Sequence, residues 1–140
     1  MICGFDSGSI QLLATAKATF MKMLHILIVE DEMMVAMNLE MMITEFVQAN
    51  IVIEASVAGT KKVLHEDLDF AFLDIDVTNG KTFEIANILE RKQVPFVFVS
   101  GSCQAELPFE LHSAPFIPKP FSAAQIERAL QAVAGSSLVN

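Results

Sequence analysis

From His25 onward, short apolar runs alternate with segments of helical periodicity. A run such as Ile26–Val29 is typical of a strand buried on both faces of a parallel sheet. The apolar runs predict five strands, at residues 26–29, 51–57, 69–73, 95–99 and 115–117. Apolar residues at spacings of three and four predict helices at residues 33–47, 59–66, 82–92 and 123–134. Pro108 limits any helix between residues 104 and 112 to a short or broken one.

The predicted helix boundaries carry turn and capping signals. Thr82 and Ser122 are candidate N-caps, and Gly135 is expected to end the last helix. Asn79-Gly80 predicts a turn. Strands that alternate with helices predict an α/β domain whose parallel sheet is covered on both faces.

One domain is expected at residues 23–136, followed by a C-terminal tail at 137–140. Residues 1–22 precede the first strand as an N-terminal extension, which we interpret as either an extra helix or a tail added by an early start codon. Met21 and Met23 are alternative starts under the second interpretation.

Composition narrows the function classes. Hydrophobic residues make up 53% of the 140 residues, but no apolar run approaches the ~20 residues of a membrane span, so no membrane partner is expected. A formal net charge of −8 argues against a nucleic-acid partner. Cys3 and Cys103 form no CxxC pair, which predicts neither zinc nor a disulfide framework and fits a cytoplasmic location.

Polar side chains gather where four of the predicted strands end. These residues are Glu30 and Asp31, Asp74, Ser100 and Lys119. Parallel strands place their carboxyl ends at one edge of the sheet, where α/β proteins bind ligands. Carboxylates held together repel by roughly 4 kcal/mol per pair at 4 Å near a protein surface. A divalent cation that prefers oxygen ligands is therefore expected among them.

Four motifs at these strand ends resemble the receiver domain of two-component response regulators. They are Ile-Val-Glu-Asp-Glu at 28–32, Phe-Leu-Asp-Ile-Asp at 72–76, Val-Ser-Gly at 99–101 and Pro-Lys-Pro-Phe at 118–121. The resemblance covers residues 25 to about 134 and implies a flavodoxin-like, doubly wound, five-stranded parallel sheet of order 2-1-3-4-5 with helices on both faces. Within that family, the chain resembles the single-domain receivers of bacteria.

The resemblance implies a role for each site residue. Asp74 would be the phosphoacceptor. Mg²⁺ would be held by Asp31, Asp74 and the main-chain carbonyl of Asp76, with Glu30 acting through a metal-bound water. Ser100 and Lys119 would contact phosphoryl oxygens.

Two further family features follow from the same match. Movement of Ser100 would be coupled to Phe116 as a switch. The bond between Lys119 and Pro120 would be a candidate cis peptide.

The function implied is that of a stand-alone receiver. It would take a phosphoryl group from a histidine kinase or a histidine phosphotransfer protein and signal by binding a downstream protein or by phosphorelay. One alternative is a phosphorylation-independent interaction module, in which a homodimer forms. Another is a haloacid-dehalogenase-like phosphatase, since Asp74-Ile75-Asp76 fits an Asp-x-Asp motif. Those enzymes carry that motif on the first strand, and here it follows the third.

The helix predicted at 33–47 carries five of the chain's eight methionines. Met34, Met37 and Met41 fall on one face, which we interpret as a docking surface for a phosphoryl donor. The competing interpretation is that the N-terminal extension covers this face or that it packs into the core.

Overall fold

The five predicted strands form one parallel sheet in the order β2-β1-β3-β6-β7. The computed structural model describes residues 23–139, so the predictions for the 1–22 extension lie outside the described residues. The strands are β1 (Leu24–Val29), β2 (Ala49–Glu54), β3 (Phe70–Leu73), β6 (Phe96–Ser100) and β7 (Phe116–Pro118). Numbered along the chain as sheet strands, this order is 2-1-3-4-5, which confirms the predicted doubly wound topology.

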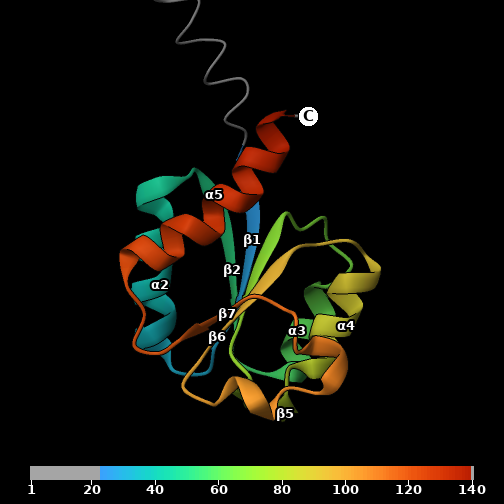
Figure 1. The fold of residues 1–140 in the computed structure, drawn as a ribbon. Coiled ribbons are helices and arrows are strands. Elements are labelled where there is room, and N and C mark those ends of the chain that lie inside the picture. The colour runs from blue at the N-terminus through green and yellow to red at the C-terminus, as the bar shows by residue number, and fades with distance from the viewer. Residues whose placement is uncertain (1–22, 140) are drawn as a thin grey trace, which may run out of the picture.

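Helices cover both faces of the sheet (Figure 1). α2 (Met33–Phe46) and α5 (Ala123–Val139) lie side by side on one face. α3 (Val57–Val63) and α4 (Phe83–Arg91) cover the other. The segment around Pro108 forms two 3₁₀ turns, η1 (Gln104–Glu106) and η2 (Phe109–Leu111), as expected of a broken helix.

Each central strand serves two hydrophobic cores. Leu27 and Val29 pack with the α3 and α4 side, whereas Ile26 and Ile28 pack with the α2 and α5 side. Side chains alternate between faces along a strand, so a strand buried on both faces must be apolar at every position. This requirement explains the uninterrupted apolar runs in the sequence.

Two boundary predictions are wrong. Val57 was expected to end the second strand, but it begins α3, because the Ser56 hydroxyl accepts a hydrogen bond from the Gly59 N–H at 2.9 Å and caps the helix. Gly135 was expected to end the last helix, but α5 continues to Val139.

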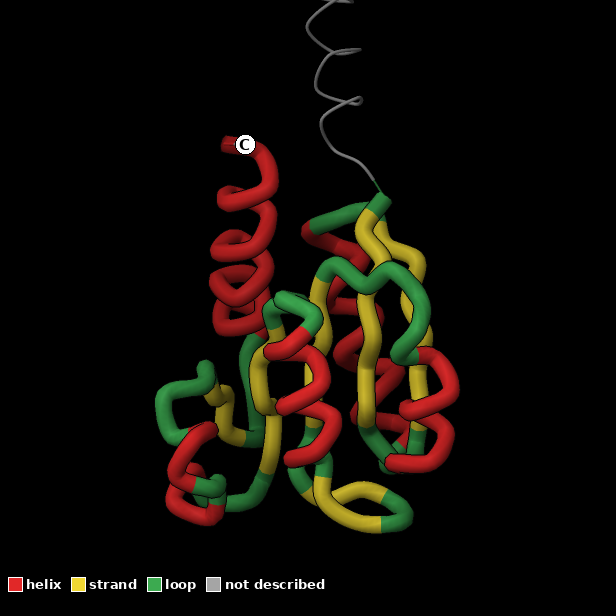
Figure 2. Tube along the Cα trace, turned by 90° about the vertical axis from the view of Figure 1, so that its right-hand side faces the viewer, coloured by secondary structure: helices red, strands yellow, loops and turns green. Residues whose placement is uncertain are grey.

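The Asn79-Gly80 turn is confirmed and closes a small hairpin of β4 (Asp76–Val77) and β5 (Gly80–Lys81). Asn79 has a φ of 76° and Gly80 a φ of 132°, conformations that favour these two residue types. The hairpin projects beyond the carboxyl edge of the main sheet (Figure 2). It was not predicted, since each of its strands is only two residues long.

Two features next to the sheet edge match the sequence. Ser122 caps α5: its hydroxyl accepts from the Gln125 N–H at 3.3 Å while the Gln125 side chain accepts from the Ser122 N–H at 2.8 Å. The peptide bond between Lys119 and Pro120 is cis.

Within residues 23–139, no helix is both long enough and apolar enough to cross a bilayer.

Candidate functional site

The carboxyl edge of the sheet brings together three residues that are far apart in the chain. Glu30 follows β1, Asp74 follows β3 and Lys119 follows β7. The Lys119 Nζ lies 2.6 Å from Glu30 Oε1 and 3.1 Å from Asp74 Oδ2. Both carboxylates are buried, so one ammonium group holds two acids inside the protein. Charge-assisted bonds of this kind are stronger than neutral ones.

Asp31 completes a group of acids that could hold a cation. Glu30, Asp31 and Asp74 each offer a carboxylate oxygen, and these oxygens all lie within 4.8 Å of one another. An all-oxygen donor set of this kind fits Mg²⁺, which is bound through few carboxylates and keeps several waters. Asp31 is exposed, so the group opens to solvent on its side.

Glu32 stands outside this group. It occupies the N-cap position of α2 and is exposed, and its main-chain N–H donates to Glu30 Oε2 at 3.1 Å. Of the three acids that end the first strand, only Glu30 and Asp31 therefore belong to the candidate cation site.

Burial and hydrogen bonding set the protonation of the Glu30–Lys119 pair. Burial raises the pKa of Glu30 above its usual range, although hydrogen bonds from Lys119 and from the Glu32 N–H work against this rise. Burial alone would lower the pKa of Lys119, but the hydrogen bond to Glu30 and the charge of Asp74 raise it instead. Lys119 is thus held as an ammonium.

The Asp74 carboxylate is held by the Ile75 backbone, and the Asp74 main chain is held by Thr82. Its Oδ1 accepts a hydrogen bond from the Ile75 N–H at 2.7 Å, which leaves Oδ2 on the side of Lys119. The Thr82 hydroxyl is buried and donates to the main-chain carbonyl of Asp74. Thr82 is the N-cap residue of α4 as predicted, but its hydroxyl makes no capping hydrogen bond to that helix. Only the tertiary position of the hairpin reveals this anchoring role.

Ser100 ends β6 and is almost fully buried. Its hydroxyl oxygen accepts from the Ser102 N–H at 3.1 Å, and its carbonyl accepts from the Lys119 N–H at 2.9 Å. Phe116 pairs with Phe98 in the register of β6 and β7 and is half-buried. The switch role of Ser100 and Phe116 stays a prediction.

The Asp76 side chain is exposed, and its carboxylate contacts Lys81 and Ser102. It forms an ion pair with Lys81, and its Oδ2 accepts from the Ser102 hydroxyl at 2.9 Å. The hydrogen bonds from Lys81 and Ser102 lower the pKa of Asp76. The expected use of its main-chain carbonyl as a metal ligand stays a prediction.

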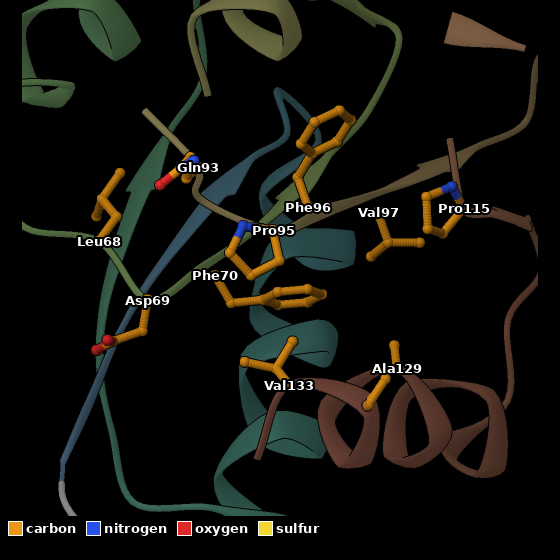
Figure 3. A pocket seen from close by; sticks show the side chains of 11 residues that line it. Leu68, Asp69, Phe70, Gln93, Pro95, Phe96, Val97, Pro115, Ala129 and Val133 are labelled. Atoms are coloured by element: carbon orange, nitrogen blue, oxygen red, sulfur yellow. The ribbon is translucent and has the colours of Figure 1, made fainter. Parts of the chain in front are cut away.

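Two hollows lie beside α5 or the segment that precedes it, one at each edge of the sheet. One, of about 410 Å³, lies between α2 and the start of the α5 segment and is lined by Met34, Val35, Asn38, Lys119, Pro120 and Phe121. It reaches the candidate site through Lys119. The other, of about 480 Å³, lies between α5 and the amino ends of β3 and β6, with Phe70, Pro95 and Val133 among its lining residues (Figure 3). It is at the opposite edge of the sheet from the acids.

Comparison with known proteins agrees with this geometry, although no protein-family model matches the chain. The sensory transduction protein LytT of Bacillus cereus is 32% identical over 114 residues, which cover 78% of this chain and 46% of LytT. The chain thus spans about half the length of the curated relatives it matches.

Solved structures share the fold. The response regulatory domain of MrkE from Klebsiella pneumoniae has a TM-score of 0.71 at 25% identity, over 83% of this chain and 99% of that domain. The receiver domain of the sensor histidine kinase PA1611 from Pseudomonas aeruginosa has a TM-score of 0.69 at 17% identity, over 81% of this chain and 99% of that domain. In that structure a magnesium ion is coordinated in the active-site cleft.

Proposed function

This chain belongs to the response-regulator receiver family, and on that premise we propose that it accepts a phosphoryl group on Asp74. The observation that carries the proposal is the arrangement around Asp74. This buried carboxylate lies 3.1 Å from the Lys119 ammonium and within reach of the Glu30 and Asp31 carboxylates, at the carboxyl edge of the sheet. Such an arrangement can bind and neutralise a transferring phosphoryl group.

In the proposed reaction, the Asp74 carboxylate attacks the phosphorus atom of the donor. The new oxygen–phosphorus bond forms as the phosphorus–nitrogen bond to the donor histidine breaks, and the nitrogen keeps the electron pair. The Ile75 N–H fixes the carboxylate through Oδ1 during the attack. Mg²⁺ held by Asp31, Asp74 and the Asp76 main-chain carbonyl, with Glu30 acting through a metal-bound water, would offset negative charge on the phosphoryl oxygens.

Lys119 and Ser100 would receive the phosphoryl group once it is attached. Phosphorylation adds about 1.5 to 2 negative charges. Lys119 would exchange part of its contact with Glu30 for a phosphoryl oxygen, and the Ser100 hydroxyl would donate to another. Contacts made only in the phosphorylated state can shift a two-state loop, and two charge-assisted bonds of roughly 1.5–3 kcal/mol each supply energy on the scale needed. Phe116 would move with Ser100.

The partners form part of the same proposal. A histidine kinase or a histidine phosphotransfer protein would supply the phosphoryl group, and a downstream protein would recognise the phosphorylated form in the cytoplasm. Action as a stand-alone receiver stays a prediction, as does homodimerisation.

Labelling by a small phosphodonor tests the proposal. The full chain is incubated with Mg²⁺ and acetyl phosphate beside the Asp74→Asn variant, and phosphorylation is measured by intact mass and by lability to base. We expect one base-labile phosphoryl group on the wild type, which does not form when Mg²⁺ is chelated beforehand and is absent from Asp74→Asn. A folded wild type that takes no label would favour the phosphorylation-independent module. Rapid turnover of the donor without accumulated label would favour a phosphatase.

A further inference from the structure

Lys81, Asp76 and Ser102 form a chain of polar contacts beside Asp74 that the proposed reaction does not use. The Lys81 ammonium pairs with Oδ1 of Asp76, and the Ser102 hydroxyl donates to Oδ2 of the same carboxylate at 2.9 Å. Lys81 lies on β5, whereas Ser102 lies in the turn that follows β6. The Asp76 carboxylate therefore links the hairpin to that turn.

The same turn holds the Ser100 hydroxyl. The Ser102 N–H donates to Ser100 Oγ at 3.1 Å, so Ser100 acts as an acceptor toward its own turn. A hydroxyl that accepts one hydrogen bond keeps its proton free to donate another. Because Ser100 is only 1% exposed, the position of Ser102 restricts where that proton can point.

We propose that Lys81 is a positioning residue for phosphoryl acceptance, which holds Asp76 against Ser102 and so keeps the Ser100 hydroxyl ready to donate. The inference rests on the proposed function of Asp74 and adds a determinant of its rate. We call the contacts from Lys81 through Asp76 to Ser102 the clamp. These contacts are partly exposed, and exposed ion pairs contribute little free energy. Loss of the clamp is therefore expected to slow phosphorylation about two- to fivefold rather than abolish it.

A second effect of Lys81 must be separated from this one. An exposed ammonium near an acidic site could also attract an anionic donor and raise the rate without positioning anything. The Ser102→Ala variant separates the two, because it breaks the link to Asp76 and leaves every charge in place.

The experiment compares initial rates of phosphorylation with Mg²⁺ and acetyl phosphate at fixed ionic strength. The variants are Lys81→Met, Lys81→Arg, Ser102→Ala and the double variant Lys81→Met/Ser102→Ala. Lys61→Met is the matched control, because the Lys61 side chain is 45% exposed and that of Lys81 is 48% exposed. Lys61 also pairs with an acid, its Nζ lying 3.0 Å from Glu84 Oε2. Melting temperature is recorded for each protein, and the amide chemical shift of Ser102 for each protein that keeps this residue.

We expect Lys81→Met and Ser102→Ala to be slowed to a similar extent, and the double variant to be no slower than the slower single variant. Lys81→Arg should restore the rate, and Lys61→Met should match the wild type. The Ser102 amide should shift in Lys81→Met but not in Lys61→Met. If phosphorylation is slowed in Lys81→Met but proceeds at the wild-type rate in Ser102→Ala, the positioning role is refuted in favour of charge attraction. Equal rates for Lys81→Met and Lys61→Met would refute any role for Lys81. A wild type that takes no label would instead refute the function of Asp74.

Discussion

At the scale of single residues, the site buries an acid, Glu30, whose ionisation is opposed by that burial. Glu30 is 4% exposed, and burial raises its pKa although Lys119 is bound to it. A raised pKa means that the folded protein prefers the protonated acid. The stabilisation from Glu30 is therefore present below its unfolded pKa of about 4.5 and is lost as the pH rises through its raised folded pKa.

Replacing Glu30 with glutamine should remove this loss. Without Mg²⁺ at pH 7, Glu30→Gln should unfold at a higher urea concentration than the wild type, because it buries no charge and its amide oxygen still accepts from Lys119, although it no longer also accepts from the Glu32 N–H. The advantage should shrink as the pH falls toward 4.5. Urea unfolding at pH 4.5 to 7 checks this, with the exposed Glu66→Gln as control. An advantage that grows toward acid pH would contradict the prediction.

The grouping of the site residues could be predicted because it depends on one rule. Glu30, Asp74 and Lys119 each follow a strand, and parallel strands end at a common edge. The anchoring by Thr82 and the clamp by Lys81 could not be predicted, because both depend on where the short hairpin lies. Nothing in local sequence places Lys81 against Asp76 rather than in solvent.

At the scale of elements, helix starts are set by single side chains that compete with the apolar pattern. Alternating Ile51, Ile53 and Val57 predicted that the second strand reaches residue 57. The strand instead ends at Glu54, because Ser56 caps α3. Ser122 was identified correctly, since its capping residue Gln125 stands three positions on. The start of a helix is therefore predictable where the capping residue follows the end of an apolar pattern, as at Ser122. It is not predictable where the capping residue lies within such a pattern, as at Ser56.

The Ser122 cap should contribute measurably to stability. Ser122→Ala removes the acceptor for the Gln125 N–H and should lower the free energy of unfolding by about 1 kcal/mol. The exposed Ser113→Ala in the loop before β7 serves as the control and should change stability little. Denaturant unfolding followed by circular dichroism measures both, and equal effects of the two variants would show that the cap adds nothing.

The methionine face of α2 lies outside the core in the described structure. Met34 is 84% exposed, Met37 53% and Met41 65%, so the part of the competing interpretation that packs them into the core is wrong. Met34 also lines the hollow that Lys119 lines, so this end of the face lies near Lys119. Whether residues 1–22 cover it lies outside the described residues.

Replacing Met37 and Met41 with glutamine tests docking on this face. Transfer from a phosphorylated protein donor that labels the wild type should slow about fivefold or more, since losing two apolar anchors costs about 1 kcal/mol or more. Labelling by acetyl phosphate should be unchanged, because that donor is too small to need the face. Parallel loss with both donors, or unchanged protein transfer, would rule out docking there.

At the scale of the whole molecule, one sheet carries two cores, so neither side can be lost alone. Ile85 on α4 and Ile126 on α5 are both fully buried, on opposite faces. They pack on the same strands, whose side chains alternate between the faces. The described domain is thus expected to unfold as one unit.

Core truncation on either face should lower the same unfolding transition. Ile85→Ala and Ile126→Ala should each cost about 2–5 kcal/mol and shift one shared midpoint. Calorimetry and circular dichroism should report coincident transitions for both variants. The chain holds no tryptophan or tyrosine, so intrinsic fluorescence cannot serve as the second probe. Two separated transitions in either variant would show that the faces are independent.

The ion pair between Glu30 and Lys119 joins positions 89 residues apart, and it has a consequence for synthesis on the ribosome. The acids of the site leave the exit tunnel first, and their counter-charge arrives only with the segment after β7. Until then the emerging chain carries a cluster of carboxylates without the lysine that neutralises two of them. The ion pair between Glu30 and Lys119 can therefore form only after the chain has been made past β7, when α5 is still to follow.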